Sequence, residues 1–471
     1  MTEFETSSSI LLERRVDHAA TGTRGQQRFN DIFAGVLVAV VALAPVPLGS
    51  NRPFFWAMWA AIVGVTAALY LILLLLRREP LRFALGRLWV PALLMLGLAG
   101  YLIVQVLPLW PNGLSFATAT GDVIVASTLS LAPGSTWLAL LQLGTYVLFF
   151  LLMLQVAVNR ARARILGVTI LAVIAAHAAY ALVALTMLGD PLLFFEKWAY
   201  EGFATGTFVN RNSFATFLAF GVVLGTVLSL REVLNGDRPG LRPGPALIYV
   251  AETGLILAAL LATGSRMGLI AALFGTAIAL LVTSRKWLKQ RGTMRWIALA
   301  AFPILAALGV LVLYGGATLE RLGSLEGDAS IRGEFYAQIV GMIAARPWLG
   351  YGAGAFEVVY PLFHQLPVSS DLVWDKAHSS YLTLWSELGL IAGSVPLVIL
   401  ALFAWQAFQL SSKRRADWAA PAVALGAIVA GGLHSLVDFS LEIEANMFLL
   451  LALLAIGIAR PEEANNNKAA R

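Results

Sequence analysis

The chain has 471 residues, of which 59% are hydrophobic and 13% are charged, and its formal net charge at pH 7 is +6. A soluble domain carries about 25% charged residues, so this composition excludes an ordinary soluble globular protein. The absence of cysteine excludes disulfide bonds, thiolate catalysis and cysteine metal sites.

Apolar runs of roughly 20 residues, the length that crosses about 30 Å of hydrocarbon, recur along the chain. They predict an all-α polytopic membrane protein with about twelve transmembrane helices. The first 30 residues are polar and lack an apolar core, so no cleavable signal peptide is expected. The predicted helices lie near residues 32–48, 54–76, 88–108, 136–158, 164–188, 213–230, 246–263, 267–283, 296–314, 384–409, 419–437 and 445–459. The seventh and eighth are so close together that they predict a tight hairpin.

The basic residues predict the orientation of these helices, because Lys and Arg are retained on the cytoplasmic side of a membrane. With the N-terminus inside, every second loop is basic and both termini are cytoplasmic. These positions explain the net charge better than nucleic-acid binding does. The basic clusters fall within residues 14–28, 77–87, 160–164, 231–242, 285–295, 413–415 and 460–471.

The helix pattern divides the chain into five predicted regions. They are a polar cytoplasmic tail (1–30), transmembrane helices one to nine (31–314), a small helical extracytoplasmic subdomain (315–383), transmembrane helices ten to twelve (384–460) and a cytoplasmic tail (461–471).

An amphipathic helix is predicted inside the extracytoplasmic subdomain and is expected to lie against the membrane domain. Pro347 ends this helix, and the glycines at 350, 352 and 354 predict a turn after it. Its apolar positions are Ile331, Phe335, Ile339, Met342 and Ile343.

Cations on the outer side of a membrane protein are scarce, so each needs a physical reason. Arg266 lies between two apolar helices with almost no loop. Its planar guanidinium suits a phosphate or pyrophosphate, and the alternative is a side chain that anchors the hairpin at the interface. The eight outer cations are Arg52, Lys197, Arg211, Arg266, Arg321, Arg332, Arg346 and Lys376.

Three other outer arginines allow similar comparisons. Arg211 begins a helix, where it contacts a ligand or anchors the interface beside a capping Asn210 or Asn212. Arg332 is predicted to open the amphipathic helix, where a cation opposes the helix dipole, and this cost favours a ligand role over a solvated one. Arg346 is expected at a helix C-terminus, where arginine is favoured without any ligand.

The histidines supply candidate bases. His378 precedes a membrane helix, and its imidazole is suited to accept a proton from a sugar hydroxyl; the alternative is an interfacial, hydrogen-bonded histidine. His434 and Asp438 are spaced i, i+4 and predict either a pair that orients the imidazole or a buried polar spot. His364 is expected at the surface, and His177 is expected to make a hydrogen bond in the core.

Several motifs are missing from the sequence. It contains no D-x-D motif for a nucleotide-sugar metal site, no Walker A loop and no His/Glu cluster with zinc spacing. The first outer loop, near residues 49–53, has no carboxylate. These absences predict chemistry without a metal or other cofactor, so activity is expected to survive a chelator.

Most of residues 200–460 resembles the O-antigen ligase and polymerase superfamily. The P-x-x-G-x-G and His-Ser blocks are specific for the superfamily but not for a reaction within it. The matching segments are Gly206-Thr207-Phe208, Asn210-Arg211-Asn212, Gly264-Ser265-Arg266, Ile331-Arg332, Ala345-Arg346-Pro347-Trp348-Leu349-Gly350-Tyr351-Gly352, Ala377-His378-Ser379-Ser380-Tyr381-Leu382, Glu387-Leu388-Gly389 and His434-Ser435-Leu436-Val437-Asp438.

The resemblance implies a membrane glycosyltransferase of the multispanning GT-C-like class in a bacterial inner membrane, inverting, metal-independent and active at the periplasmic face. Its implied donor is a glycan linked to undecaprenyl pyrophosphate, and its acceptor is a glycan or lipid-linked glycan. Membrane lipids and other polysaccharide-assembly proteins are further candidate partners. The implied catalytic residues are Arg266 and Arg332 at the pyrophosphate and His378 as the base; the implied substrate-binding residues are Arg211, Asn210, Glu387, His434 and Asp438.

Three functions remain open at this point. A polymerase for exopolysaccharide, capsule or O-antigen repeats is preferred over a ligase that transfers the glycan to lipid A core or protein. The third is a twelve-helix secondary transporter. Against it, the halves show no repeat, and the membrane interior lacks the acidic residues that couple ions.

Overall fold

The computed structural model describes residues 24–235, 244–287, 325–371, 373–413 and 418–459, and within these ranges it is mostly helical. The predicted ninth membrane helix, near 296–314, lies outside the described residues, as do Arg321, most of the N-terminal tail and the C-terminal tail. The α-helices are α2 (Arg24–Leu43), α3 (Pro53–Arg77), α4 (Trp89–Val106), α5 (Pro133–Ala157), α6 (Arg160–Met187), α7 (Arg211–Asn235), α8 (Gly244–Ala262), α9 (Arg266–Trp287), α11 (Leu325–Ala345), α12 (Phe356–Val359), α13 (Ser380–Lys413), α14 (Ala419–His434) and α15 (Glu444–Ile458).

Eight of the described helices, α3 to α9 and α13, are long and apolar enough to cross a membrane, and α14 and α15 are shorter apolar helices. The chain is therefore a helical, multi-pass membrane protein. The total of twelve spans stays a prediction. The first predicted helix is shifted: α2 ends at Leu43, where Pro45 and Pro47 prevent regular hydrogen bonding, and a short 3-10 helix η1 (Leu48–Ser50) follows.

Helix α7 forms the centre of the bundle. Its side chains from Ser213 to Leu230 are all buried, so protein rather than lipid surrounds it. Helices α6, α8, α9, α14 and α15 pack on it. Helices α9 and α14 approach each other closely: a Cβ on Gly275 would lie 2.5 Å from the carbonyl oxygen of Gly426. Small residues of this kind let membrane helices pack backbone to backbone.

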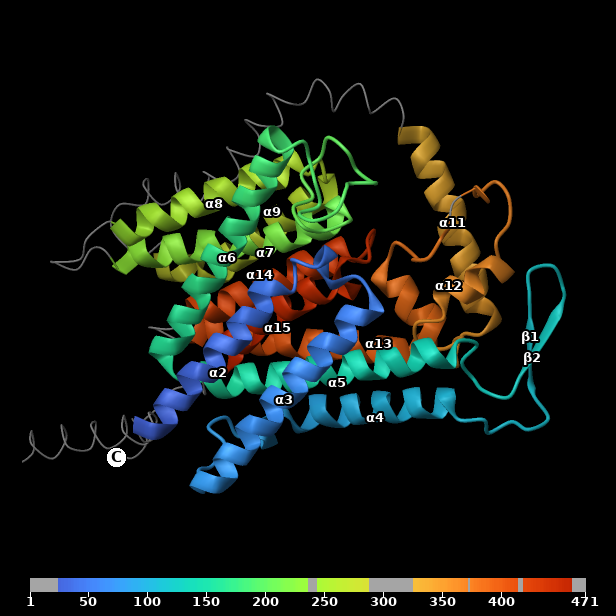
Figure 1. Ribbon diagram of the computed structural model, residues 1–471, viewed down its shortest axis with the longest axis horizontal. Coiled ribbons are helices and arrows are strands. Elements are labelled where there is room, and N and C mark those ends of the chain that lie inside the picture. Colours follow the sequence, from blue (N-terminus) through green and yellow to red (C-terminus); the bar gives the residue numbers. More distant parts are fainter. Residues whose placement is uncertain (1–23, 236–243, 288–324, 372, 414–417, 460–471) are drawn as a thin grey trace, which may run out of the picture.

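Figure 1 shows α4, α5 and α13 side by side, with α11, α12 and a β-hairpin gathered beyond one end of them. The hairpin, β1 (Leu114–Ala117) paired with β2 (Val123–Ala126), corrects the all-α prediction. It was missed because its apolar residues alternate over only four positions per strand.

Helix α11 confirms the predicted amphipathic helix and packs on α13. Phe335, Ile339, Met342 and Ile343 are buried as predicted. The prediction that Ile331 lies on the buried face is wrong, because 40% of its surface is exposed. The helix also begins earlier than expected, at Leu325, so it extends further than the apolar pattern alone indicates.

The glycine-rich segment after α11 docks onto a break in α13. Gly389 has φ 76° and interrupts the helix, which frees the carbonyls of Ser386 and Glu387. These accept hydrogen bonds from the N–H groups of Tyr351 (3.1 Å) and Gly352 (2.9 Å). Gly350, Gly352 and Gly354 all have positive φ, which confirms the predicted turn. The P-x-x-G-x-G and Glu-Leu-Gly blocks are thus two halves of one structural joint.

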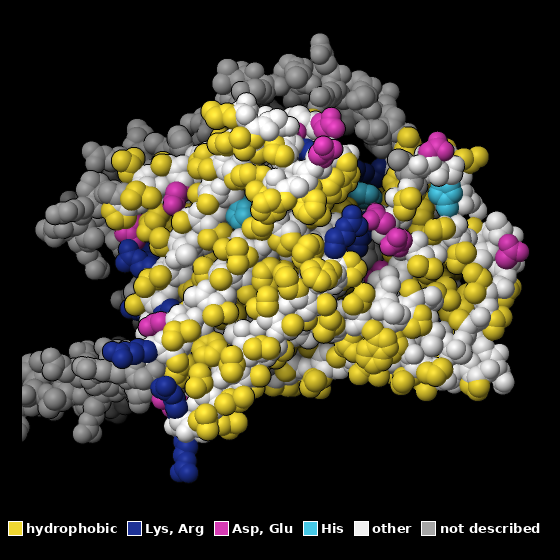
Figure 2. All heavy atoms as spheres, in the orientation of Figure 1, with side chains coloured by type: hydrophobic (Ala, Val, Ile, Leu, Met, Phe, Trp, Pro, Cys, Tyr) yellow, Lys and Arg dark blue, Asp and Glu magenta, His cyan; other side chains and the backbone are white. Residues whose placement is uncertain are grey.

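Basic side chains lie at the end of the bundle opposite the glycine-rich segment. Arg162 is ion-paired with Asp31 (2.7 Å), and Arg164 is ion-paired with Glu232 (2.8 Å), which joins the ends of α2, α6 and α7. Figure 2 shows Lys and Arg at this end, and a second group of basic, acidic and histidine side chains in a hollow between the bundle and the part formed by α11 and α12.

Candidate active site

His378 occupies a strained backbone position next to the first turn of α13. Its φ of 50° lies in the left-handed region, which costs a residue with a side chain about 1–2 kcal/mol. The Tyr336 hydroxyl donates a hydrogen bond to its carbonyl oxygen (2.8 Å). Two residues further on, the amide of Ser380 donates to the carbonyl oxygens of Ser435 (3.1 Å) and Asp438 (3.3 Å). Contacts from α11 and from the turn after α14 therefore hold the strained residue.

The imidazole of His378 lies among three aromatic rings. The ring centroid of Phe439 is 5.2 Å away, and those of Phe335 and Trp374 are each 6.3 Å away, all near edge-to-face. Burial and the nearby Arg332 charge lower the pKa of His378, and Asp375 opposes them by raising it. A lowered pKa keeps the ring neutral near pH 7, which is the state that accepts a proton.

Arg332 provides a cation beside this imidazole. Besides His378, its guanidinium acts electrostatically on Tyr200, Tyr336 and Asp438. Arg332 is exposed and lies in the second turn of α11, so the expectation that it opens the helix is wrong. The helix dipole therefore gives no reason to expect a ligand role for Arg332. Its place beside His378 and Asp438 supports that role instead.

Arg211 begins α7 as expected, and the Asn210 side-chain oxygen caps that helix by accepting from the amide of Asn212 (2.7 Å). The guanidinium carbon of Arg211 lies 4.2 Å from the ring centroid of Phe203 and 5.5 Å from that of Tyr200. Tyr200 is also within electrostatic reach of Arg332 and Asp438, so it connects Arg211 to the surroundings of His378.

Arg266 joins this group through the turn that precedes it. Helices α8 and α9 are connected by three residues, which confirms the tight connection, although both pack mainly on α7. Gly264 has φ 62°, and a Cβ there would lie 2.7 Å from Phe203 and 3.1 Å from the Arg211 guanidinium. Ser265 caps α9 by accepting from the Gly268 amide (3.2 Å). Arg266 itself is exposed at the first position of α9.

The predicted His434–Asp438 pair does not form. Helix α14 ends at His434, so the two residues do not share a helical face. The Nδ1 atom of buried His434 instead contacts the hydroxyl of Thr216 on α7, which ties the two helices together. Asp438 accepts hydrogen bonds from the side chains of Ser440 and Asn212 (3.4 Å for the latter), and burial raises its pKa to about 6. Asp438 therefore lies within electrostatic reach of Arg332, whereas His434 packs between α14 and α7.

Glu387 is also placed differently from the expectation of a substrate contact. Its two carboxylate oxygens accept from the backbone amides of Gly354 (2.8 Å) and Phe356 (3.1 Å). Only 9% of the residue is exposed. It therefore fixes the glycine-rich joint and the start of α12, which is a structural role.

Several other singled-out residues have structural contacts. Arg346 lies 4.1 Å from the ring centroid of Phe116, so it clamps the β-hairpin to the subdomain. Lys197 is ion-paired with Asp190 (2.7 Å). His177 contacts the Ala42 carbonyl (3.0 Å), as expected of a core residue. His364 is only half-buried and contacts the Val368 carbonyl (2.9 Å).

The structure adds three residues to the site. Tyr336 follows Arg332 by four positions on one helix face, and Asp375 precedes His378 by three. The sequence spacing could therefore have indicated both residues. No sequence pattern could have indicated Tyr200, because it lies in an irregular segment before α7. Lys376, next to Asp375, is 3.5 Å from the Glu442 carboxylate. The negative charges of Glu442 and Asp375 raise the pKa of Lys376, although burial acts to lower it.

Residues 253–397 match the family model described as O-antigen ligase. This part of the chain is similar to the O-antigen ligase family. The match covers a little under a third of the sequence and confirms the resemblance to the O-antigen ligase and polymerase superfamily. A comparison with curated proteins finds no match.

The O-antigen ligase match runs from within α8 to within α13 and includes Arg266, Arg332 and His378. Arg211 and Asp438 lie outside it and reach the same region through the fold. The family supports a membrane enzyme of the glycosyltransferase type over the transporter hypothesis.

Proposed function

We propose that the protein is a glycan polymerase at the periplasmic face of a bacterial inner membrane. It would transfer an oligosaccharide from undecaprenyl pyrophosphate to a hydroxyl of a second glycan, with inversion and without a metal. The observation that carries this proposal is the placement of the His378 imidazole among Phe335, Trp374 and Phe439, next to the Arg332 charge that lowers its pKa, inside the family-matched segment.

In the proposed step, the acceptor oxygen forms a bond to the anomeric carbon of the donor sugar. The bond from that carbon to the pyrophosphate oxygen breaks, and the acceptor proton passes to His378. The leaving lipid pyrophosphate gains negative charge. Arg332, with Arg211 and Arg266 as further contacts, would stabilise that charge, as preorganised cations do in other transferases.

The donor lipid supports a site at this end of the bundle. Its polyprenyl chain stays in the bilayer while its glycan is outside, so the reacting atoms lie at the interface. The same end of the bundle carries the strained His378, the beginnings of α7 and α9, and the exposed Arg332. The basic residues at the opposite end favour that end as cytoplasmic.

A ligase is the second candidate, because the matching family model bears that description. The two reactions share the donor and the leaving group and differ in the acceptor. A chromosomal deletion separates them: accumulation of single lipid-linked repeat units supports a polymerase, whereas accumulation of full-length unattached chains supports a ligase.

The catalytic proposal is tested with His378→Ala and the matched control His364→Ala in purified protein with a lipid-linked donor. Loss of a general base lowers the rate by about 10²–10⁴-fold. The His378 variant should insert normally and lose product formation to that extent, while the His364 variant stays close to wild type. Wild-type turnover in the His378 variant would end its assignment as the base.

A further inference from the structure

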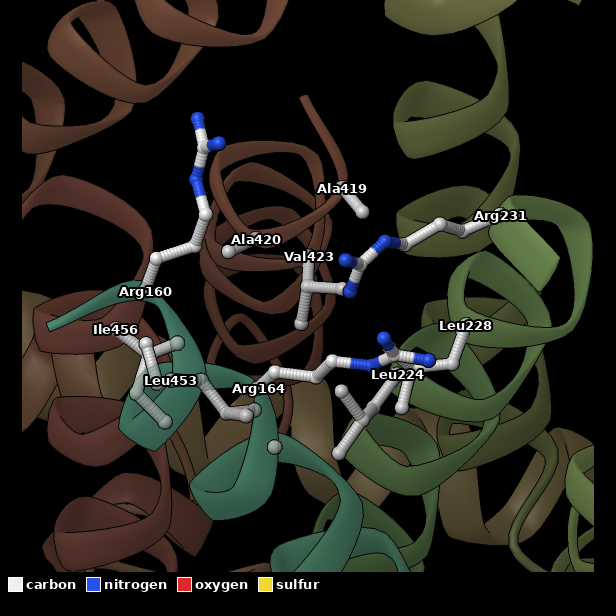
Figure 3. A pocket seen from close by; sticks show the side chains of 12 residues that line it. Arg160, Arg164, Leu224, Leu228, Arg231, Ala419, Ala420, Val423, Leu453 and Ile456 are labelled. Carbon is white, nitrogen blue, oxygen red and sulfur yellow. The ribbon is translucent and has the colours of Figure 1, made fainter. Parts of the chain in front are cut away.

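A polar-rimmed pocket lies at the end of the bundle opposite His378. It is a cavity of about 40 Å³ between the ends of α6, α7, α14 and α15 (Figure 3). Helix α7 begins at Arg211 in the candidate active site and reaches the pocket at Arg231, about 30 Å further along at 1.5 Å per residue. The pocket is therefore separate from the proposed catalytic centre.

The floor of the pocket is apolar and buried. Leu224 and Leu228 come from α7, Val423 from α14, and Leu453 and Ile456 from α15. Ala163, Gly167, Ala419 and Ala420 also line it, and their small side chains leave the space above that floor open.

Three arginines surround the opening. Figure 3 shows the side chains of Arg164 and Arg231 reaching toward each other across the pocket, from α6 and α7, while Arg160 rises at its edge. Two carboxylates share this neighbourhood. Glu232 is ion-paired with Arg164 (2.8 Å), and Glu252, with Glu232, Arg164 and Arg231, is within electrostatic reach of Tyr249. All three arginines line the pocket and neither of these acids does, so guanidinium groups are the charged groups of its described lining.

We propose that this pocket binds the phosphate group of an anionic membrane lipid. Guanidinium groups from two helices offer the planar donors that phosphate oxygens prefer. A buried water needs about 10–15 Å³, so this cavity of about 40 Å³ has space for a small polar group but not for a whole lipid. Ile165, next to Arg164, is 64% exposed, and Leu247 of the neighbouring α8 is 71% exposed, which gives the acyl chains an apolar surface. Basic pockets between membrane helices bind lipid headgroups in this way.

The test uses purified full-length protein and Arg160→Gln/Arg231→Gln, with Arg78→Gln/Arg87→Gln as a control of equal charge. The control arginines are exposed, belong to the same end of the bundle and do not line the pocket. Arg164 is left intact because its removal would strand Glu232. Native mass spectrometry counts the phosphatidylglycerol molecules retained, and thermal unfolding is compared in nanodiscs of phosphatidylglycerol and phosphatidylcholine. A third arm adds inorganic phosphate to protein in phosphatidylcholine.

The pocket variant should retain several-fold less phosphatidylglycerol than the wild type and lose the lipid-dependent rise in Tm, while the control keeps both. Equal losses in both variants would overturn the proposal, because they would show only general attraction to an anionic surface. A full rise in Tm with inorganic phosphate alone would also overturn it, by assigning the pocket to a free anion. If the double variant does not fold, Arg160→Gln alone is held to the same comparison.

Discussion

At the residue scale, the candidate active site depends on charges of opposite effect around one imidazole. Arg332 and burial lower the pKa of His378, while Asp375 raises it. The ring is therefore tuned by one residue on α11 and by one in its own segment. Neither residue touches the backbone contacts that hold His378 in place, so each is expected to change titration without removing the base.

The pH profile of kcat/KM tests this tuning. Proton transfer needs neutral His378, so activity should be constant above its pKa and fall as the pH drops through it. Arg332→Gln removes a cation that lowers this pKa, so the acidic fall should begin at a higher pH. Asp375→Asn removes an anion that raises it, so the fall should begin at a lower pH. Shifts in the same direction for both variants would contradict His378 as the titrating group.

At the element scale, the arrangement depends on short connections rather than on the long helices. The three-residue turn between α8 and α9 presents Arg266, and Gly264 within it lets Phe203 and Arg211 approach. The joint between the glycine-rich segment and the break at Gly389 positions the subdomain in the same manner. Each connection offers a substitution with a matched control.

Gly264→Ala should damage both stability and catalysis. The left-handed backbone costs a residue with a Cβ about 1–2 kcal/mol, and that Cβ would collide with Phe203 and press on Arg211. We expect a lower Tm and at least a tenfold lower rate. The control is Gly254→Ala in α8, where a Cβ meets nothing within 4 Å; there, alanine should leave the Tm equal or higher. Equal behaviour of the two variants would show that the turn does not position Arg211.

Glu387→Ala should loosen the subdomain without touching the proposed chemistry. It removes the acceptor for the amides of Gly354 and Phe356, and a hydrogen bond of this kind contributes about 0.5–1.5 kcal/mol. We expect a lower Tm and faster proteolysis within residues 354–371, with the exposed Glu357→Ala unchanged. A loss of substrate affinity at wild-type stability would instead restore the substrate role inferred from sequence.

The sequence predicted periodic elements well and their contacts poorly. Apolar length identified the described membrane helices, and helical spacing identified four buried positions of α11. Local pattern missed the β-hairpin because its strands are short. It also did not identify the partners of His434 and Glu387, because Thr216 is distant in sequence and the Gly354 contact is made by the backbone. Side-chain partnership depends on tertiary packing, which a single sequence does not contain.

At the scale of the whole molecule, two polar ends face away from each other across an apolar bundle. One end carries His378, Arg332 and the beginnings of α7 and α9, and the other carries the ion pairs Arg162–Asp31 and Arg164–Glu232. A lipid-linked donor and an anionic lipid would thus contact opposite leaflets. The proposed function requires a definite orientation, with the His378 end outside.

The natural absence of cysteine makes that orientation directly measurable. Single cysteines are placed at Val373, which is 84% exposed near His378, and at Leu85, which is 40% exposed between α3 and α4. A maleimide that does not cross membranes should label Val373→Cys in intact cells, and should label Leu85→Cys only after permeabilisation. The unsubstituted chain is the blank, and activity of both variants confirms folding. The reverse labelling pattern would place His378 in the cytoplasm, away from any periplasmic glycan, and the proposed polymerase would have to be abandoned.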